Sequence, residues 1–218
     1  KLDNYPHVGL AYSQSWEINS QGKRLRSMKK WTNELDKERW AEDFVQPGIN
    51  EIKYLFFKIT IPNASAVLMR RNIFLEAGKF DTQMRLAADW ILWVKILMIS
   101  DIAFVAEPLN YFRTHASTVT SLATKSGIFV EENYQVQKYM LTCLNFSFSA
   151  EYIERVCNRR AEEWVHTIFT SRGQINFAQQ IKNYQVASSI DPKIIPRLTK
   201  KFSLRLFAAI KKRVLEHL

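Results

Sequence analysis

The fold is decided around residues 87–98, whose sequence is AADWILWVKILM. Large apolar residues recur there at spacings of three and four, which predicts a helix with a wide buried face. Two short apolar segments follow at 102–105 and 109–112, on either side of Glu107-Pro108, and they predict strands. Another strand-like segment, 8–13, lies near the start of the chain. Helix and strands mixed in this way predict an α/β arrangement.

Working outward from this helix, the pattern predicts further short elements upstream. They are strands at 16–18 and 61–69, and helices at 36–44 and 73–77. Asn72 is expected to cap the last of these helices and Gly78 to end it. Residues 19–22 predict a tight turn, and residues 23–34 and 79–87 predict loops.

Downstream of about residue 127 the pattern is helical to the end of the sequence. Breaks are expected near 145–150, 172–173 and 191–192. The predicted organisation is therefore an α/β domain with a mixed sheet over residues 1–120, followed by an all-helical region over residues 121–218.

Composition excludes several classes of protein. The 218 residues are 47% hydrophobic and 24% charged, close to the globular average, which argues against wholesale disorder. No stretch approaches the roughly 20 uncharged apolar residues of a membrane-spanning helix, and the first residues carry no apolar signal core. Cys143 and Cys157 are too few for a disulfide framework or a zinc site, so we expect reduced thiols and a cytoplasmic location.

The net charge of +10 is concentrated near the end of the sequence. Residues 197–218 contain seven basic residues and one acidic residue, and apolar residues recur there every four positions from Phe202 to Leu218. On a helix this pattern makes an apolar stripe beside cations. It suits packing on the preceding helices, or peripheral contact with an anionic membrane surface.

Two places could carry chemistry. Asp89 stands at the start of the central helix, where it is either a first-turn acid that stabilises the helix or a general base at the rim of a cleft. Arg113 and His115, followed by hydroxyl residues, are either a polar surface loop or ligands for phosphate or a metal. No glycine-rich phosphate loop, nucleophile elbow or Cys–His pair is present.

The order of several short motifs adds a resemblance. These are Asn63-Ala64-Ser65, Arg70-Arg71, Gly78-Lys79-Phe80-Asp81, Ala88-Asp89-Trp90, Glu107-Pro108-Leu109 and Tyr111-Phe112-Arg113 with His115. Over about residues 5–120 this succession resembles the second half of a family 2 glycosyltransferase. The family implies a GT-A fold and inverting transfer from a nucleotide-sugar donor, linked to UDP or GDP, to a glycan or lipid-linked acceptor.

The resemblance also implies roles for individual residues. Asp89 matches the catalytic base, although Ala88 stands where many members have Glu. Asn63, Ser65, Trp90 and Arg113 would contact substrate, and His115 would approach the donor diphosphate or its metal, Mg²⁺ or Mn²⁺.

One departure from the family bears on what this chain would do alone. No Asp-x-Asp, the family's metal-binding motif, occurs in the sequence. The chain is thus expected to be a C-terminal portion without the nucleotide-binding half, inactive by itself, with an exposed sheet edge that favours self-association.

Two other classes of function remain open. One is a structural or interaction module with the helical region as scaffold. The other is a nucleic-acid-binding module, favoured only by the basic composition, because the basic residues cluster in one segment and RNA-binding signatures are missing.

Overall fold

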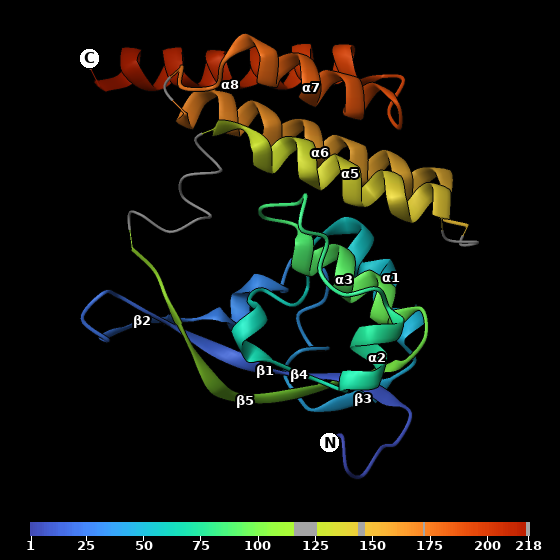
Figure 1. Ribbon diagram of the computed structural model, residues 1–218. Coiled ribbons are helices and arrows are strands. Elements are labelled where there is room, and N and C mark those ends of the chain that lie inside the picture. Colours follow the sequence, from blue (N-terminus) through green and yellow to red (C-terminus); the bar gives the residue numbers. More distant parts are fainter. Residues whose placement is uncertain (116–125, 144–146, 172, 217–218) are drawn as a thin grey trace. The chain divides into compact units, whose positions relative to one another are not determined.

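The computed structural model describes residues 1–115, 126–143, 147–171 and 173–216, with the side chains of residue 143 and of residues 209–216 left out (Figure 1). The chain divides into two compact units, unit 1 over Lys1–Thr118 and unit 2 over Val119–Leu218. Each unit is described by itself. The predicted boundary, at residues 120 and 121, lies outside the described residues.

Unit 1 is built on a five-stranded mixed sheet. Its strands are β1 (Val8–Ile18), β2 (Arg24–Ser27), β3 (Phe44–Gln46), β4 (Val67–Met69) and β5 (Asp101–Arg113). The order is β2-β1-β5-β3, and β4 pairs with the other end of β1. The long pair β1–β5 is parallel, whereas β2, β3 and β4 are antiparallel to their neighbours. The prediction of an α/β fold with a mixed sheet is confirmed at this level.

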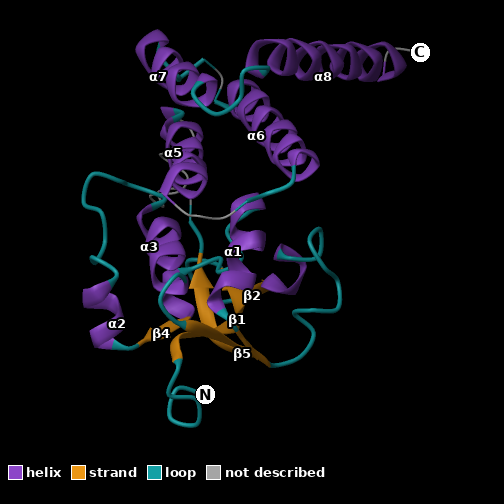
Figure 2. Cartoon of the chain, turned by 90° about the vertical axis from the view of Figure 1, so that its right-hand side faces the viewer, coloured by secondary structure: helices purple, strands orange, loops and turns teal. Residues whose placement is uncertain are grey.

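Three α-helices belong to unit 1: α1 (Gly48–Phe57), α2 (Arg71–Glu76) and α3 (Ala88–Leu97). Figure 2 shows α1 and α3 on the same side of the sheet. Almost every residue of α3 from Trp90 to Leu97 is buried. The wide apolar face expected from residues 87–98 therefore forms the centre of this core, together with the inward residues of β1, β5 and α1.

The start of α1 is held by a close approach of backbones. A Cβ on Gly48 would lie 2.1 Å from the carbonyl oxygen of Ser100 and 2.4 Å from that of Leu97. The Gly48 N–H also donates to the Asp101 carboxylate, 3.3 Å away. Only glycine leaves room for α1 to begin against the end of α3, which fixes the two helices relative to β5.

Several local predictions were wrong. No helix forms over 36–44: Asp36 Oδ1 accepts the N–H groups of Glu38 and Arg39, and the segment ends in β3. Such an Asx turn competes with helix formation. The strand expected over 61–69 is reduced to β4, preceded by a 3₁₀ turn over Ala64–Ala66.

Other predicted elements were merged, shifted or missed. The short strands expected at 8–13 and 16–18 form one continuous strand, β1, and those expected at 102–105 and 109–112 form β5. The pairing of β5 is irregular after Val105, where Asp43 accepts the Ala106 N–H at 2.8 Å. Helix α2 is confirmed, and Gly78, with φ of +88°, follows its C-cap Ala77, but the N-cap is Arg70 and not Asn72. The loop expected over 23–34 contains β2 and a 3₁₀ turn, and α1 was not predicted.

Unit 2 is helical, as predicted. Its described helices are α5 (Ile128–Cys143), α6 (Ala150–Thr170), α7 (Phe177–Ser188) and α8 (Ile194–Glu216). Their core gathers Tyr134 from α5, Trp164 from α6, Ala187 from α7 and Ile194 from α8. The break near 191–192 is confirmed, and α6 ends at Thr170 before α7 begins at Phe177. Residue 172 and residues 144–146 of the other predicted breaks lie outside the described residues. Cys157 is a free, buried thiol inside α6.

Within the part of the chain that the structure describes, none of the helices combines the length and the apolar character that crossing a bilayer would require.

Candidate functional site

Asp89 lies in the first turn of α3, as expected from the sequence. The N-terminus of a helix favours a negative charge because its unpaired N–H groups carry partial positive charge. Asp89 is neither buried nor fully exposed, and its Oδ1 accepts the Trp90 N–H at 2.7 Å. A carboxylate in this setting is anchored through the buried helix behind it and still reaches the surface.

Trp90 anchors that same turn from inside the core. It is only 3% exposed, and its indole N–H donates to the Leu55 carbonyl oxygen at 3.1 Å. The bond ties the beginning of α3 to the end of α1. Such burial favours a packing role for Trp90 over the acceptor contact that the resemblance implied.

Asn63 and Ser65 form one end of a polar cluster. The Ser65 hydroxyl donates to Asn63 Oδ1 at 3.1 Å, and Asn63 Nδ2 donates to Ser15 Oγ at 3.2 Å. Asn110 completes the cluster, because its Nδ2 donates to Ser15 Oγ at 3.0 Å and to Asn63 Oδ1 at 2.8 Å. The two predicted residues therefore lie together, with two partners that the sequence analysis did not single out.

The cluster fills a gap beside β1. Strand β4 pairs with Leu10–Tyr12 and β2 with Trp16–Ile18, so Ser15 lies between the two partners. Ser15 and Asn63 are buried, whereas Ser65 is exposed. The cluster thus runs from the sheet to the surface and ends in a hydroxyl. Ser15 pairs with Asn110 of the neighbouring strand β5, and no local sequence pattern predicts this pairing.

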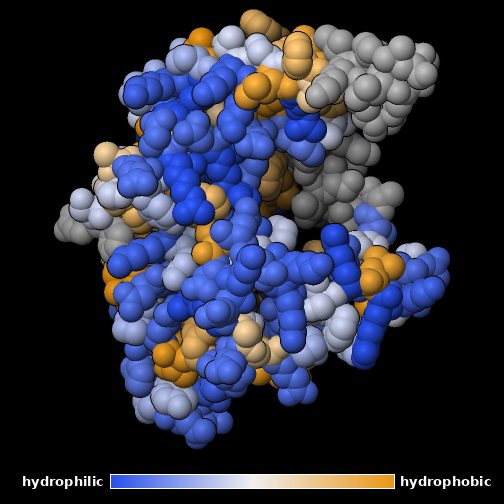
Figure 3. Space-filling view, turned by 180° about the vertical axis from the view of Figure 1, so that it is seen from behind, coloured by the Kyte–Doolittle hydropathy of each residue, from blue (hydrophilic) through white to orange (hydrophobic). Residues whose placement is uncertain are grey.

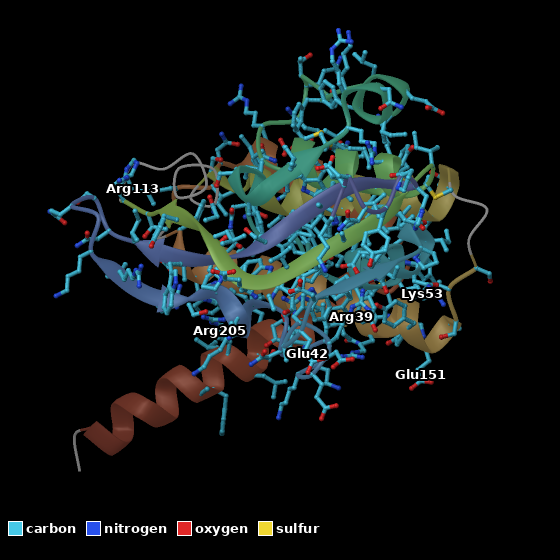
Figure 4. All side chains as sticks on the ribbon, turned by 90° about the horizontal axis from the view of Figure 1, so that it is seen from below. Arg39, Glu42, Lys53, Arg113, Glu151 and Arg205 are labelled. Carbon is cyan, nitrogen blue, oxygen red and sulfur yellow. The ribbon has the colours of Figure 1, made fainter. Side chains whose placement is uncertain are left out.

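Arg113 lies at the end of β5 (Figure 4). Its Nη1 donates to the carbonyl oxygens of Asn19 and Ser20, at 3.1 and 2.8 Å. These bonds hold the turn between β1 and β2, so one side of the guanidinium serves the fold. His115 follows two residues later and is exposed, next to residues outside the described part.

The structure offers little for the metal that the resemblance implied. Among the described residues no group of three or more His, Cys, Asp or Glu side chains could hold a metal ion. His115 would supply a single ligand, and a stable divalent site needs several. For this reason no chemical step below passes through Mg²⁺ or Mn²⁺.

A second polar cluster surrounds Glu51, which sequence reasoning missed. Its carboxylate is fully buried and accepts from Arg39 Nη2 at 2.7 Å, Gln46 Nε2 at 2.8 Å and the Thr60 hydroxyl at 2.5 Å. Burial raises the pKa of Glu51, while Arg39 and the hydrogen bonds oppose the rise. Because the carboxylate is enclosed by three donors, it fixes architecture and is out of reach of a substrate.

Arg39 connects this cluster to the surface. Its guanidinium lies over the rings of Phe44 and Tyr54, at 4.2 and 4.7 Å. A surface depression of about 680 Å³ lies beside it, lined by Lys37, Glu38, Arg39, Ala41, Glu42, Asp43 and Phe44. Figure 4 labels Arg39 and Glu42 in this segment. The depression has mixed charges, and none of the residues predicted for catalysis lines it.

A scan against protein-family models and searches of curated proteins and of solved structures find no match to this chain.

Proposed function

We propose that unit 1 is the acceptor side of an inverting glycosyltransferase that uses a nucleotide-sugar donor, with Asp89 as the general base. The observation that carries the proposal is the half-buried Asp89 carboxylate in the first turn of α3. Its helix is rigid because nearly all of the following turns are in the core. A general base has to be both held in place and accessible to the proton that it takes.

In the proposed reaction the acceptor hydroxyl gives its proton to the Asp89 carboxylate. The acceptor oxygen forms a bond to the anomeric carbon of the donor sugar from the opposite face to the leaving group. The bond between that carbon and the diphosphate oxygen breaks, and the electron pair leaves with the nucleoside diphosphate. The stereochemistry at the anomeric carbon is inverted.

The polar cluster would serve the acceptor sugar. Ser65 is exposed at its outer end, and its hydroxyl is oriented by the bond to Asn63. Asn63 is in turn held by Asn110 and Ser15, so the cluster presents a preorganised hydroxyl. We assign Ser65 to contact the acceptor, and Asn63 to position it.

The donor side of the reaction is assigned more sparsely. Arg113 and His115 would face the diphosphate, with Arg113 balancing phosphate charge through the donors that the β1–β2 turn does not use. Because Asp-x-Asp is missing from the sequence, the donor metal would be held by residues outside these 218.

The test measures UDP or GDP release from nucleotide sugars, with Mg²⁺ or Mn²⁺ and a panel of glycan and lipid-linked acceptors, using the protein extended upstream. Asp89→Asn should lower the transfer rate by about 10²–10⁴-fold while nucleotide binding, measured by calorimetry, is retained. Asp36→Asn is the matched control, because Asp36 Oδ1 also accepts backbone N–H groups.

Transfer by Asp89→Asn within about tenfold of the wild-type rate would rule out the base assignment. If the extended protein binds neither UDP nor GDP, the proposal as a whole fails and an interaction module becomes the better interpretation.

A further inference from the structure

The exposed large apolar side chains of unit 2 are confined to two of its helices. Among the described residues, all of them lie on α7 or α8, and α5 and α6 have none. They are Phe177, Ile181, Tyr184, Ile195, Phe202, Leu204, Leu206 and Phe207. Figure 3 shows hydrophobic side chains exposed among hydrophilic ones in this part of the molecule. Clustered exposure of this kind marks a surface that binds something.

On α7 the exposed residues form one stripe. Phe177, Ile181 and Tyr184 follow one another at spacings of four and three, so they share a face. Phe177 is 80% exposed. The other face of α7 packs inward through Asn183 and Ala187, both buried. The stripe is therefore separate from the residues that hold α7 in the unit.

On α8 one side is likewise used for packing. Lys201 pairs with Glu162 of α6 at 2.8 Å, and the ring of Phe202 lies 5.0 Å from that of Phe169. Leu204 and Phe207 are not part of this contact and are 60% and 72% exposed. Helix α8 thus has apolar side chains on two sides, and only the side that carries Phe202 packs against α6.

A groove connects the two helices. It has a volume of about 370 Å³ and is lined by Trp164, Val165, Ile168, Gln180, Leu198, Thr199, Phe202 and Ser203. Gln180 belongs to α7, next to the stripe, and Phe202 is one of the exposed apolar residues of α8. The groove therefore lies between the two helices, with Gln180 as its wall on α7 and Leu198 and Phe202 on α8.

Charge is divided between the same pairs of helices. Helix α8 carries seven basic residues and one acidic residue, and α7 carries one lysine and no acid. Helices α5 and α6 together carry six acidic and four basic residues. Figure 4 labels Arg205 on α8, where its guanidinium lies 5.4 Å from the ring of Phe169. Two of the α8 cations are already paired within the unit, Arg197 with Glu154 and Asp191, and Lys201 with Glu162. Lys200 is exposed beside them. Apolar exposure and positive charge therefore coincide on α8, next to the apolar stripe of α7.

We propose that α7 and α8 form a peripheral docking surface for membranes that contain anionic lipids. Helices that bear exposed apolar residues beside Lys and Arg lie in the interface plane, where acyl chains take the apolar side chains and headgroups pair with the cations. Nucleic acid would satisfy only the cations, since the aliphatic Ile195, Leu204 and Leu206 gain nothing from phosphates. The proposal does not depend on glycosyl transfer.

The test is flotation of the whole chain with vesicles of phosphatidylcholine alone, or of phosphatidylcholine mixed with phosphatidylglycerol. The wild-type chain should bind the mixed vesicles and lose binding as salt is raised. Leu204→Asp with Phe207→Asp should weaken binding by about tenfold or more. Leu109→Asp with Leu68→Asp is the matched control in unit 1, because these leucines are 61% and 67% exposed.

Lys200→Glu tests the charge separately and should reduce binding to mixed vesicles only. Far-UV circular dichroism checks that each variant keeps its helices. The proposal is overturned if the wild-type chain does not bind mixed vesicles, if the α8 double variant binds as well as wild type, or if the unit 1 control loses as much. It is also overturned if that double variant abolishes a dimer seen by size-exclusion chromatography, since the surface would then hold a second copy.

Discussion

Arg39–Glu51 in unit 1 and Arg197–Glu154 in unit 2 are both arginine–glutamate pairs, but the pKa of the carboxyl moves in opposite directions in the two. Glu51 in unit 1 is fully buried, and desolvation raises its pKa although Arg39 is bonded to it. Glu154 in unit 2 has a side chain that is 49% exposed, and Arg197, bonded to both of its oxygens, lowers its pKa to about 2. Each arginine lowers the pKa of its acid, but for Glu51 desolvation outweighs this effect, because water remains available only to Glu154.

The comparison also bears on Asp89. An enclosed carboxylate such as Glu51 cannot meet a substrate, and a carboxylate held by a bidentate arginine, such as Glu154, is a poor proton acceptor because it is strongly acidic. Asp89 lies between these extremes of exposure, at a helix N-terminus. This intermediate setting is why we propose Asp89, and neither of these two glutamates, as the general base.

The largest effect is expected for Glu51→Ala. The substitution leaves Arg39, Gln46 and Thr60 without their common acceptor inside the protein, which should lower the free energy of unfolding by roughly 3–5 kcal/mol. Urea unfolding followed by tryptophan fluorescence measures it. Glu42→Ala is the control, because Glu42 is exposed in the same segment. A loss below about 1 kcal/mol would mean that Glu51 is not the centre of the cluster.

A smaller loss is expected for Arg197→Met. Asp191 is 2% exposed and accepts from Arg197 Nε at 2.9 Å, so the variant leaves a buried carboxylate with fewer donors. The Lys193 N–H still donates to it at 3.0 Å. We expect unfolding of the helices to become easier by roughly 1–3 kcal/mol, measured by urea titration of far-UV circular dichroism. An unchanged urea midpoint would contradict a stabilising role for the Arg197–Asp191 ion pair.

The pH dependence of Glu154→Gln should follow the lowered pKa. The pair stabilises the fold fully above the usual pKa of 4.5, and this contribution is lost as pH falls toward about 2. The difference in unfolding free energy between wild type and variant should therefore shrink as pH is lowered from roughly 5 toward 2. Urea titrations at several pH values measure this difference.

Glu51→Gln should show the opposite trend. A carboxyl with a raised pKa in the folded state loses stabilising effect as pH rises above 4.5, because the unfolded chain releases its proton first. The difference between wild type and Glu51→Gln should thus shift in favour of the variant as pH rises. If the stability differences for Glu51→Gln and Glu154→Gln changed with pH in the same direction, burial would not explain the opposite pKa shifts of the two acids.

The smallest effect is expected for Glu162→Gln. Its partner Lys201 lies 2.8 Å away, but the two side chains are 64% and 27% exposed. Exposed ion pairs contribute about 0–1 kcal/mol, so the unfolding midpoint should hardly move. A loss of stability as large as that expected for Arg197→Met would show that the exposure of an ion pair does not predict its contribution to stability.

How far the sequence predicts the fold depends on the kind of pattern. Helix α3 and the helices of unit 2 were predicted because periodic apolar residues end at signals such as Gly173. Helix α1 was missed because Pro47-Gly48 at its start is a typical signal for a break in structure, although its buried residues recur at helical spacing. The helix at 36–44 was predicted from amphipathic spacing. In the structure Arg39 donates instead to Glu51, and the Trp40 indole N–H donates to the Tyr12 hydroxyl.

The candidate site was predictable only where it depends on local sequence. The start of α3 places Asp89, and that can be read from neighbouring residues. The polar cluster joins Ser15, Asn63 and Asn110, which are brought together by the pairing of β1 with β5. Such contacts are set by tertiary structure, so no local pattern announces them.

The parallel pairing of β1 with β5 also has a consequence for synthesis of the chain. Val8 pairs with Asp101, so the ribosome has to add more than 90 residues after Val8 before its partner is made. At about 5–20 residues per second this takes roughly 5–20 s. During that interval β1 can pair only with the nearer strands β2 and β4, which leaves its other edge open to chaperones or to neighbouring nascent chains.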